Sequence, residues 1–322
     1  MRTKKITGKV LIQTILNYCI YLLLLLVCII LSLTTTSFLS VTNIINVLLQ
    51  TSIIAVLSLG ITFVLITGNN DLSVGGVMAV AGAAGIGLIK LEGWPWWAGM
   101  LVILAVAVAF GAINGMVVAY IKAPAFLTTL ATQFIGRGLA LVISGGSSWY
   151  DLPKPFTFLS STYVIGIPLM ILIILLLYLV FHIRLSKTIF GRRVYAVGSN
   201  AESARVSGIN VPKTILLAYM QCGLLVGIAT ILQVARMNSF WAAMGTGIEA
   251  QAIAGAIIGG ASMAGGVGNL VGTFAGVLLM GVINNALNLY GIDANWQDAA
   301  RGFVIMLAII IDAVRNRYNA VE

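Results

Sequence analysis

Long apolar runs separated by short polar segments are the dominant pattern of this chain. A helix needs roughly 20 apolar residues to cross the hydrocarbon core of a bilayer, and most of the runs reach about that length. The pattern therefore predicts an all-α, polytopic membrane helix bundle of about ten transmembrane helices, forming one domain over residues 1–322. The expected spans are residues 11–33, 43–67, 73–90, 96–121, 124–143, 163–183, 213–236, 250–263, 269–290 and 297–314.

Composition supports a membrane location. Of the 322 residues, 60% are hydrophobic and only 8% are charged, whereas soluble domains carry about 25% charged residues. A large core does not explain this deficit, because a soluble core still needs a hydrated surface. A surface that faces lipid removes that need.

Positive charge predicts the orientation of the spans. The net charge is +9, and the basic residues lie in the gaps between apolar runs rather than on one face of a soluble domain, so no nucleic-acid partner is expected. If the spans alternate from a cytoplasmic N-terminus, the outside segments hold only Lys90, Lys154 and Arg236. The inside segments hold many more, which places both termini in the cytoplasm. These inside residues are Arg2, Lys4, Lys5, Lys9, Lys122, Arg184, Lys187, Arg192, Arg193, Arg205, Lys213, Arg315 and Arg317.

Glycines spaced four residues apart predict close helix packing, since small residues let helix backbones approach in lipid. The pairs begin at Gly111, Gly255 and Gly272. A short echo is also present: residues 111–114 read Gly-Ala-Ile-Asn and residues 281–284 read Gly-Val-Ile-Asn, and each is followed one span later by an Arg-Gly pair. The echo indicates inverted repeats, a common transporter architecture; chance similarity is the alternative.

Motifs for enzymatic chemistry are missing from the sequence. There is no Gly-x-x-x-x-Gly-Lys-Ser/Thr phosphate loop, so this chain is not expected to hydrolyse ATP by that route. His182 is the single histidine, which precludes a metal cluster or catalytic pair built from histidines. No catalytic residue, metal or cofactor is therefore expected, and the informative residues are the polar ones within the apolar runs, where polar groups usually mark cavities or partners.

A polar segment interrupts the apolar pattern after the second predicted span. It reads Thr67-Gly-Asn-Asn-Asp-Leu-Ser73. Gly68 can end a helix, and Asp71 or Ser73 can cap the next one. Two interpretations stay open: a broken helix that lines the pathway through Asn69, Asn70, Asp71 and Ser73, or an ordinary cytoplasmic turn.

The fifth span carries a polar stripe. Thr129, Gln133 and Arg137 are spaced four residues apart and share one helix face, which Thr128 and Thr132 widen. Such a face does not point to lipid, so it points to the translocation path or to a neighbouring helix. Near the C-terminus, Asn284 and Asn288 form a second polar face and are further pathway candidates, while Asp298 and Arg301 are spaced for an ion pair.

The long inside segment, residues 184–212, predicts a short helix outside the membrane. Ser199 and Glu202 have the spacing of a capping box, and Gly208 can end the helix. Small residues such as Ala201 and Ala204 suit insertion into a groove of another protein; a helix on the membrane surface is the alternative. The longest outside loop, residues 144–161, is a candidate docking surface for an external partner.

Several motifs together resemble the permease subunits of bacterial carbohydrate-type ATP-binding-cassette importers, the ribose permease-like family. The resemblance covers nearly the whole chain. It departs from the family pattern at Asn69 and Asn70, where the family usually has Gly-Ile. The motifs are Thr67-Gly-Asn-Asn-Asp-Leu-Ser-Val-Gly75, Pro124-Ala-Phe-Leu-Thr-Thr-Leu130, Arg137-Gly-Leu-Ala140, Phe190-Gly-Arg-Arg-Val-Tyr-Ala-Val-Gly198, Ala204-Arg-Val-Ser-Gly-Ile-Asn210, Gly259-Gly-Ala-Ser-Met-Ala-Gly-Gly-Val-Gly268 and Asn284-Asn-Ala-Leu-Asn288.

The resemblance implies a vitamin-B12-permease-like fold in the cytoplasmic membrane and import of a monosaccharide, ribose or another simple sugar. It implies a second permease subunit in a homodimer or heterodimer, a separate cytoplasmic ATPase, and a periplasmic or lipid-anchored sugar-binding protein. Alternatives are import of a nucleoside or a furanosyl signalling molecule, or ion-coupled secondary transport with Asp71 and Asp298 as the carboxylates. The residues expected to contact the ATPase are Gly191, Arg192, Arg193, Ser199, Glu202, Ala204, Arg205 and Gly208.

Overall fold

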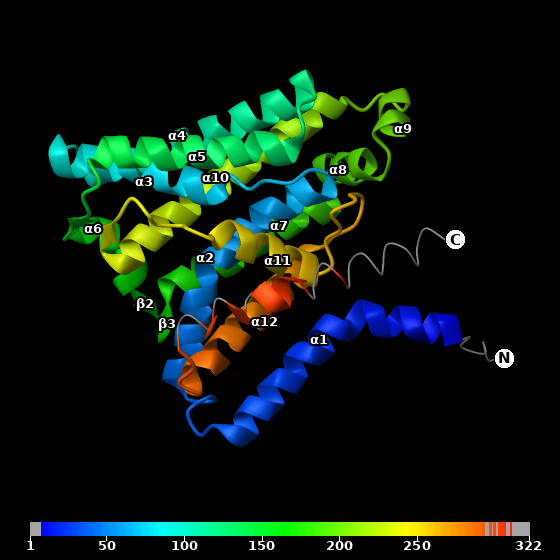
Figure 1. Ribbon diagram of the computed structural model, residues 1–322, viewed down its shortest axis with the longest axis horizontal. Coiled ribbons are helices and arrows are strands. Elements are labelled where there is room, and N and C mark those ends of the chain that lie inside the picture. The colour runs from blue at the N-terminus through cyan, green and yellow to red at the C-terminus, as the bar shows by residue number, and fades with distance from the viewer. Residues whose placement is uncertain (1–7, 294–295, 298, 301, 307–309, 311–322) are drawn as a thin grey trace.

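A computed structural model describes residues 8–293, 296–297, 299–300, 302–306 and 310. This described part of the chain is mostly helical, and the helices run alongside one another as a layered bundle (Figure 1). The long helices are α1 (Gly8–Thr34), α2 (Val41–Ile66), α3 (Val74–Leu91), α4 (Trp96–Met116) with the π-helical turn η1 (Val117–Ile121), α5 (Ala125–Ser144), α7 (Leu169–Lys187), α10 (Val211–Met237) and α12 (Leu270–Leu289). The short elements are α6 (Lys154–Ser161), α8 (Ile189–Ser199), α9 (Ala201–Val206), α11 (Ile248–Ile258), β1 (Trp149–Tyr150), β2 (Tyr163–Val164), β3 (Ile167–Pro168) and β4 (Ser239–Phe240).

The predicted polytopic helical fold is confirmed. Within the described residues, seven helices are long and apolar enough to cross a membrane: α2, α3, α4 with η1, α5, α7, α10 and α12. Two predicted spans need correction. The eighth, residues 250–263, is the 11-residue helix α11, which at 1.5 Å per residue is too short for a hydrocarbon core of about 30 Å. The sixth begins at Leu169, because residues 163–168 form the hairpin β2–β3. Much of the last, residues 297–314, lies outside the described residues.

Helix α2 forms the centre of the bundle. It packs against α10, α12, α11 and α7, and its residues from Ile53 to Ile66 are almost all buried. An apolar helix that is covered on every side needs no amphipathic stripe. By contrast α5 exposes most of its apolar side chains and α7 exposes one apolar face, so both lie at the periphery of the single chain, where lipid or another subunit covers them.

Glycines mark the closest helix contacts, as predicted from their spacing. A Cβ atom at Gly111 in α4 would lie 2.5 Å from the carbonyl oxygen of Tyr219 in α10, and one at Gly259 would lie 2.3 Å from the carbonyl oxygen of Gly272 in α12. Real side chains do not tolerate such distances. The glycines therefore permit backbone contact between α4 and α10 and between α11 and α12.

The same packing arrangement occurs twice. Helix α4 packs on α10 around Gly111, and α12 packs on α2 around Gly281, where a Cβ atom would collide with Thr51. Helix α3 packs on α4 as α11 packs on α12. Side-chain caps at Ser40 and Asn210 begin α2 and α10, which are 26 and 27 residues long. This correspondence supports the internal repeat that the sequence echo predicted, with α3 and α11 in equivalent places.

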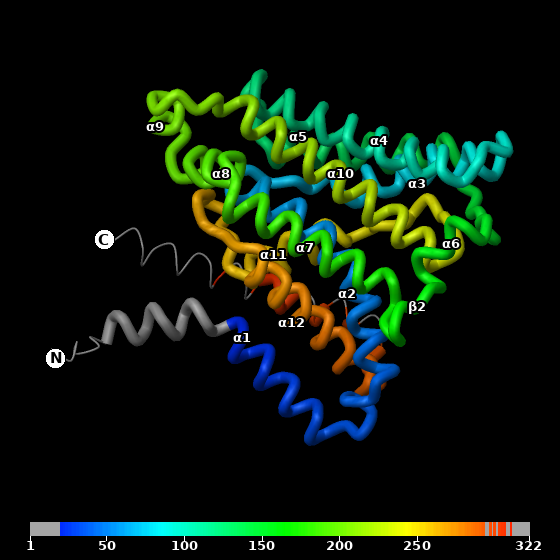
Figure 2. The backbone as a smooth tube through the Cα atoms, turned by 180° about the vertical axis from the view of Figure 1, so that it is seen from behind, coloured from blue at the N-terminus to red at the C-terminus, as the bar shows by residue number. Residues whose placement is uncertain are grey.

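The two ends of the bundle differ in construction. Helices α8 and α9 lie at one end, and α6 with the β2–β3 hairpin lies at the other (Figures 1 and 2). At the second end, β1 pairs with β4 and Trp149 stacks on Phe240 with ring centroids 5.1 Å apart. These contacts anchor the 144–161 loop to the end of α10.

Candidate functional site

The segment between α2 and α3 is a buried break in the helical path. Gly68 follows α2 with a φ of +79°, in the left-handed region that favours glycine. Asp71 is 3% exposed and Ser73 is 2% exposed, and Tyr219 of α10 donates a hydrogen bond to the Asn70 carbonyl oxygen (2.7 Å). This burial favours the broken helix over the exposed turn.

A chain of buried hydrogen bonds ties this break to two other helices. The Asp71 carboxylate accepts from the Ser73 backbone N–H (2.9 Å) and hydroxyl (2.6 Å). The Asn114 amide of α4 donates to the Ser73 hydroxyl oxygen (2.8 Å), and the Thr132 hydroxyl of α5 donates to the Asn114 side-chain oxygen (2.6 Å). Of the two predicted caps of α3, Ser73 occupies the cap position but makes no side-chain capping bond, whereas Asp71 accepts the Ser73 N–H. Asn114 was not predicted to belong to this hydrogen-bond network, because it is a single polar residue in an apolar run.

The polar stripe of α5 faces its own subunit. Gln133 accepts a hydrogen bond from the Gly76 N–H in the first turn of α3 (2.5 Å). Thr129 is fully buried and its hydroxyl donates to the Ala125 carbonyl oxygen of its own helix (2.8 Å). Two alternatives were predicted for the stripe, facing the translocation path or facing a neighbouring helix. The buried Thr129 and Thr132 fit the second. Gln133 and Arg137 are half-buried, as is Thr128 at the start of the stripe, so these residues keep access to space beside α5.

Arg137 and Glu249 form a charged centre near the middle of the bundle. The Arg137 Nη1 atom donates to the Met244 carbonyl oxygen (2.7 Å), in the loop before α11, and Glu249 lies in the first turn of α11. The Arg137 Nη2 atom and the Glu249 Oε2 atom are both buried and have no hydrogen-bond partner. Sequence analysis missed Glu249. The available signal was a single acidic residue opening a short glycine-containing helix.

The polar residues of α12 lie apart from this centre. Asn288, in the last turn of the helix, is exposed and accepts a hydrogen bond from Gln297 (3.0 Å). The neighbouring Asn285, not predicted, exchanges two hydrogen bonds with Asn43 of α2 (3.1 and 2.8 Å). Asn284 is half-buried. Asp298 and Arg301, the predicted ion pair, lie outside the described residues.

Two short helices follow α7. Thr188 caps α8 by accepting from the Gly191 N–H (3.3 Å), and Asn200, not Ser199, caps α9 by accepting from the Ser203 N–H (2.8 Å). The predicted capping residue is therefore wrong by one position, because Ser199 still belongs to α8. Gly208, with a φ of +80°, ends the helix as predicted. The Ile209 N–H bonds to the Ala204 carbonyl oxygen (3.0 Å), in the pattern of a Schellman motif.

The residues predicted to contact the ATPase fall into a buried group and an exposed group. Gly191 and Ala204 are buried within the chain, so the expectation that Ala204 offers a small contact surface to a partner is wrong. Val206, which was not predicted, is 78% exposed. The remaining predicted residues are exposed, and Glu202 pairs with Arg205 (Nε to Oε2, 3.0 Å), which lowers the pKa of Glu202. They are Arg192, Arg193, Ser199, Glu202, Arg205 and Gly208.

Helix α8 rests directly on the end of α2. A Cβ atom at Gly198 would collide with the Ile66 carbonyl oxygen, and one at Gly265 would lie 2.7 Å from the Gly198 carbonyl oxygen. The Gly266 N–H donates to the Ile66 carbonyl oxygen (2.9 Å), and the Tyr195 hydroxyl donates to the Gly268 carbonyl oxygen (2.6 Å). The α11–α12 loop, the end of α2 and α8 are therefore one packed unit, and the buried break begins there.

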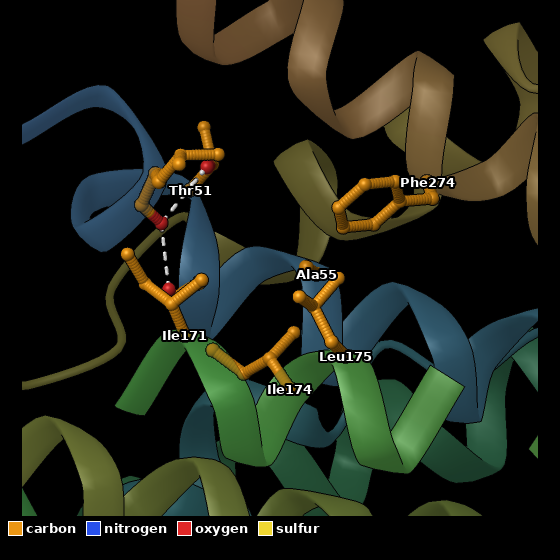
Figure 3. Close-up of a pocket in the computed structure, with 8 residues that line it drawn as sticks. Thr51, Ala55, Ile171, Ile174, Leu175 and Phe274 are labelled. Atoms are coloured by element: carbon orange, nitrogen blue, oxygen red, sulfur yellow. Dashed lines mark hydrogen bonds between the residues drawn. The ribbon is translucent and has the colours of Figure 1, made fainter. Parts of the chain in front are cut away.

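One cavity near the bundle surface is apolar. It has a volume of about 160 Å³ and lies between α2, α7 and α12 (Figure 3). The hydroxyl of Thr51, its most polar labelled residue, is already bonded to the carbonyl oxygen of Val47 (2.8 Å). A polar solute finds no converging polar groups here, so this cavity is a poor candidate site. Its other labelled residues are Ala55, Ile171, Ile174, Leu175 and Phe274.

Known proteins match this chain almost end to end. A family model described as "Branched-chain amino acid transport system / permease component" matches residues 43–309. The ribose import permease protein of Escherichia coli K12 is 36% identical over 289 residues, which cover 86% of this chain and 87% of that protein. The one of Bacillus subtilis is 37% identical over 296 residues (89% and 90%). The D-allose transport system permease protein of Escherichia coli K12 is 34% identical over 297 residues (92% and 91%).

Proposed function

Because the chain belongs to this family of transport-system permease components, we propose that it imports a monosaccharide, such as ribose, as the permease subunit of an ATP-binding-cassette importer. It is a multi-pass protein of the cytoplasmic membrane. The observation that carries the proposal is the similarity, over nearly the full length, to permeases of ribose and allose import. These relatives handle different simple sugars, so the proposal names a class of substrate with ribose as its first representative.

The proposed architecture is a single membrane domain over residues 1–322 with about ten membrane-crossing segments, the eighth made of the loop after β4 together with the short helix α11. It has a vitamin-B12-permease-like fold and both termini in the cytoplasm. The excess of basic residues on the inside segments supports this orientation. It places α8 and α9 in the cytoplasm and α6 with the 144–161 loop outside. The repeated pairing of α4 with α10 and of α12 with α2 supports two related halves.

ATP hydrolysis is assigned to a separate cytoplasmic subunit, which docks on α8 and α9. Exposed arginines at positions 192 and 193 supply charge, and exposed Val206 supplies an apolar contact between charged neighbours. Both helices are capped, so little ordering is needed on docking. Movement of the ATPase would reach the pathway through Gly198 and Ile66, because α8 touches the end of α2 where the buried break begins.

Two further partners complete the proposed importer. A periplasmic or lipid-anchored sugar-binding protein docks on the anchored 144–161 loop. A second permease subunit, identical or related, covers part of the exposed apolar surface of the bundle, and membrane lipid covers the rest. The pathway uses the polar groups of the break and of α5, with Asn284 and Asn288 as its members on α12. On the break and α5 these residues are Asn69, Asn70, Gln133 and Arg137, whereas the buried Asp71, Ser73 and Thr129, also predicted for the pathway, support them from behind.

Reconstitution of the complete importer tests the proposal. The chain is purified with its co-expressed ATPase and binding protein, placed in proteoliposomes, and supplied with ribose, allose or xylose. We expect one sugar-loaded binding protein to stimulate ATP hydrolysis and to deliver sugar without an ion gradient. Uptake that needs an ion gradient and no ATP would instead support ion-coupled transport, and stimulation by a nucleoside alone would reassign the substrate.

The docking surface is tested by charge reversal. Arg192→Glu combined with Arg193→Glu should reduce co-purification of the ATPase, because both side chains are exposed on α8. Lys154→Glu, an exposed change at the opposite end of the bundle, is the matched control. Equal recovery of the ATPase with all variants would place the contact elsewhere.

A further inference from the structure

Two helix N-termini meet near the middle of the bundle. Helix α3 begins there after the buried break, and α11 begins there as an 11-residue helix. Their backbones touch, since a Cβ atom at Gly75 would lie 2.3 Å from the Gly245 carbonyl oxygen. Gly245 itself has a φ of +73°. Interrupted helices in corresponding places of two repeats are where transporters hold polar solutes, and each N-terminus adds partial positive charge.

Charged and amide groups from α5 and α11 converge on this junction. The Glu249 Oε2 atom of α11 lies 2.6 Å from the position of a Cβ atom at Gly75, and the Gln133 Nε2 atom of α5 lies 3.2 Å from the same point. Arg137 follows Gln133 by one turn of α5 and interacts electrostatically with Glu249. One carboxylate and one amide therefore lie at the start of α3, and one guanidinium lies beside them at the loop before α11.

Two of these groups have hydrogen-bonding capacity that the protein does not use. The Arg137 Nη2 atom is a buried donor and the Glu249 Oε2 atom is a buried acceptor, and neither has a partner. Within the described residues they form no direct ion pair, although Glu202 with Arg205 does. An unpaired buried polar atom is costly, and two such atoms of opposite character near one another indicate that a third group bridges them.

A hydroxyl group is the simplest bridge, because it donates one hydrogen bond and accepts others. It would donate to the Glu249 carboxylate and accept from the Arg137 guanidinium, while the Gln133 amide nitrogen offers a second donor. The two opposite charges sum to zero, so the junction suits a neutral solute and disfavours an ionic one. We propose that Glu249, Arg137 and Gln133 form a subsite that binds a hydroxyl of the transported sugar as it passes the α3–α11 junction.

This inference rests on the proposed function, and the test separates the two. The complete importer is reconstituted with the wild-type chain, Glu249→Gln, Arg137→Lys, and the control Glu92→Gln, whose exposed carboxylate follows α3 at its other end. D-Ribose is the first probe, followed by D-allose and D-xylose. Three quantities are measured: ATPase co-purified, ATP hydrolysis stimulated by the loaded binding protein, and sugar imported per ATP.

Loss of a hydrogen bond to a charged group should lower sugar imported per ATP by about tenfold or more in both site variants, with stimulated hydrolysis kept within about twofold. Glu92→Gln should match wild type. Normal import per ATP in assembled Glu249→Gln overturns the subsite and leaves the proposed function intact. A wild-type complex that no sugar stimulates overturns the proposed function and the subsite with it.

Failure of assembly is resolved by a charge-balanced variant. If the single variants do not assemble, Glu249→Gln is combined with Arg137→Gln, which removes both charges. Recovered assembly with normal import per ATP would show that the two charges only stabilise each other, and would overturn the subsite. Recovered assembly with import per ATP still reduced by about tenfold supports it, because a structural role alone does not alter transport per ATP.

Discussion

Two polar clusters lie close together near the start of α3, and they differ in how completely they are satisfied. In the first, Asp71, Ser73, Asn114 and Thr132 form a continuous chain of hydrogen bonds. In the second, Arg137 and Glu249 each keep a buried atom without a partner. A satisfied buried network rigidifies a fold, whereas unsatisfied atoms provide binding capacity. The first cluster is therefore expected to govern stability and the second to govern transport.

The largest effect should come from breaking the satisfied network at Asp71. Asp71→Ala leaves the Ser73 N–H and hydroxyl without their shared acceptor, and unpaired buried groups of this kind cost about 1–3 kcal/mol each. We expect a marked fall in the amount of monodisperse protein that survives heating in detergent. Asp71→Asn, which retains an oxygen acceptor, should lose less. Equal heat resistance of Asp71→Ala and wild type would contradict a structural role for the network.

A smaller loss is expected at the contact that holds α3 against α5, next to both clusters. A Cβ atom at Gly76 would lie 2.3 Å from the Gln133 carbonyl oxygen, and forced overpacking typically costs about 1–3 kcal/mol. Gly76→Ala should therefore lower the melting temperature. Gly138→Ala on α5 is the control, because no atom lies within 4 Å of its Cβ position. Similar melting of the two variants would show that α3 and α5 can separate without penalty.

Two threonines on α5 differ in whether their hydroxyl groups bond to another helix or to their own. Thr132 donates to Asn114 on another helix (2.6 Å), whereas Thr129 bonds to carbonyl oxygens of its own helix. Thr132→Val should destabilise the protein by about 1 kcal/mol, and Thr129→Val by less, as measured by thermal unfolding. A larger loss at Thr129 would mean that the link between helices contributes little.

The smallest effect is expected from the exposed ion pair of α9. Its hydrogen bonds and charge attraction from Arg205 lower the pKa of Glu202, so the carboxylate stabilises the fold above its ordinary pKa and this contribution disappears as pH falls through the lowered value. Solvent screens the pair, and Glu202→Gln should melt almost as wild type does at neutral pH. Any small difference should vanish in acid or in high salt. A difference that grows under either condition would refute this assignment.

The class of the protein and most of its spans could be predicted from the amino-acid sequence. Charge depletion, long apolar runs and the distribution of basic residues depend on the bilayer, which acts on each segment separately. The glycine spacings also predicted close contacts that the fold contains, as at Gly111 and Gly259. The local sequence correctly predicted that α9 ends at Gly208. The predicted N-terminal cap of α9 was wrong by one residue, because Ser199 and Asn200 are both good capping residues and α8 extends through Ser199.

Which polar residues have hydrogen-bond partners, and which do not, depends on how the helices pack in three dimensions. Thr129 and Arg137 share one face in sequence, but Thr129 bonds to its own helix whereas Arg137 reaches the loop before α11. Glu249 became a candidate site residue only because the fold places the start of α11 beside the start of α3, although the two segments are far apart in the sequence. Ala204 was likewise buried by contacts that no local pattern encodes. Hydrogen bonding and burial between distant segments depend on how helices pack, and a periodic pattern along one helix does not specify its neighbour.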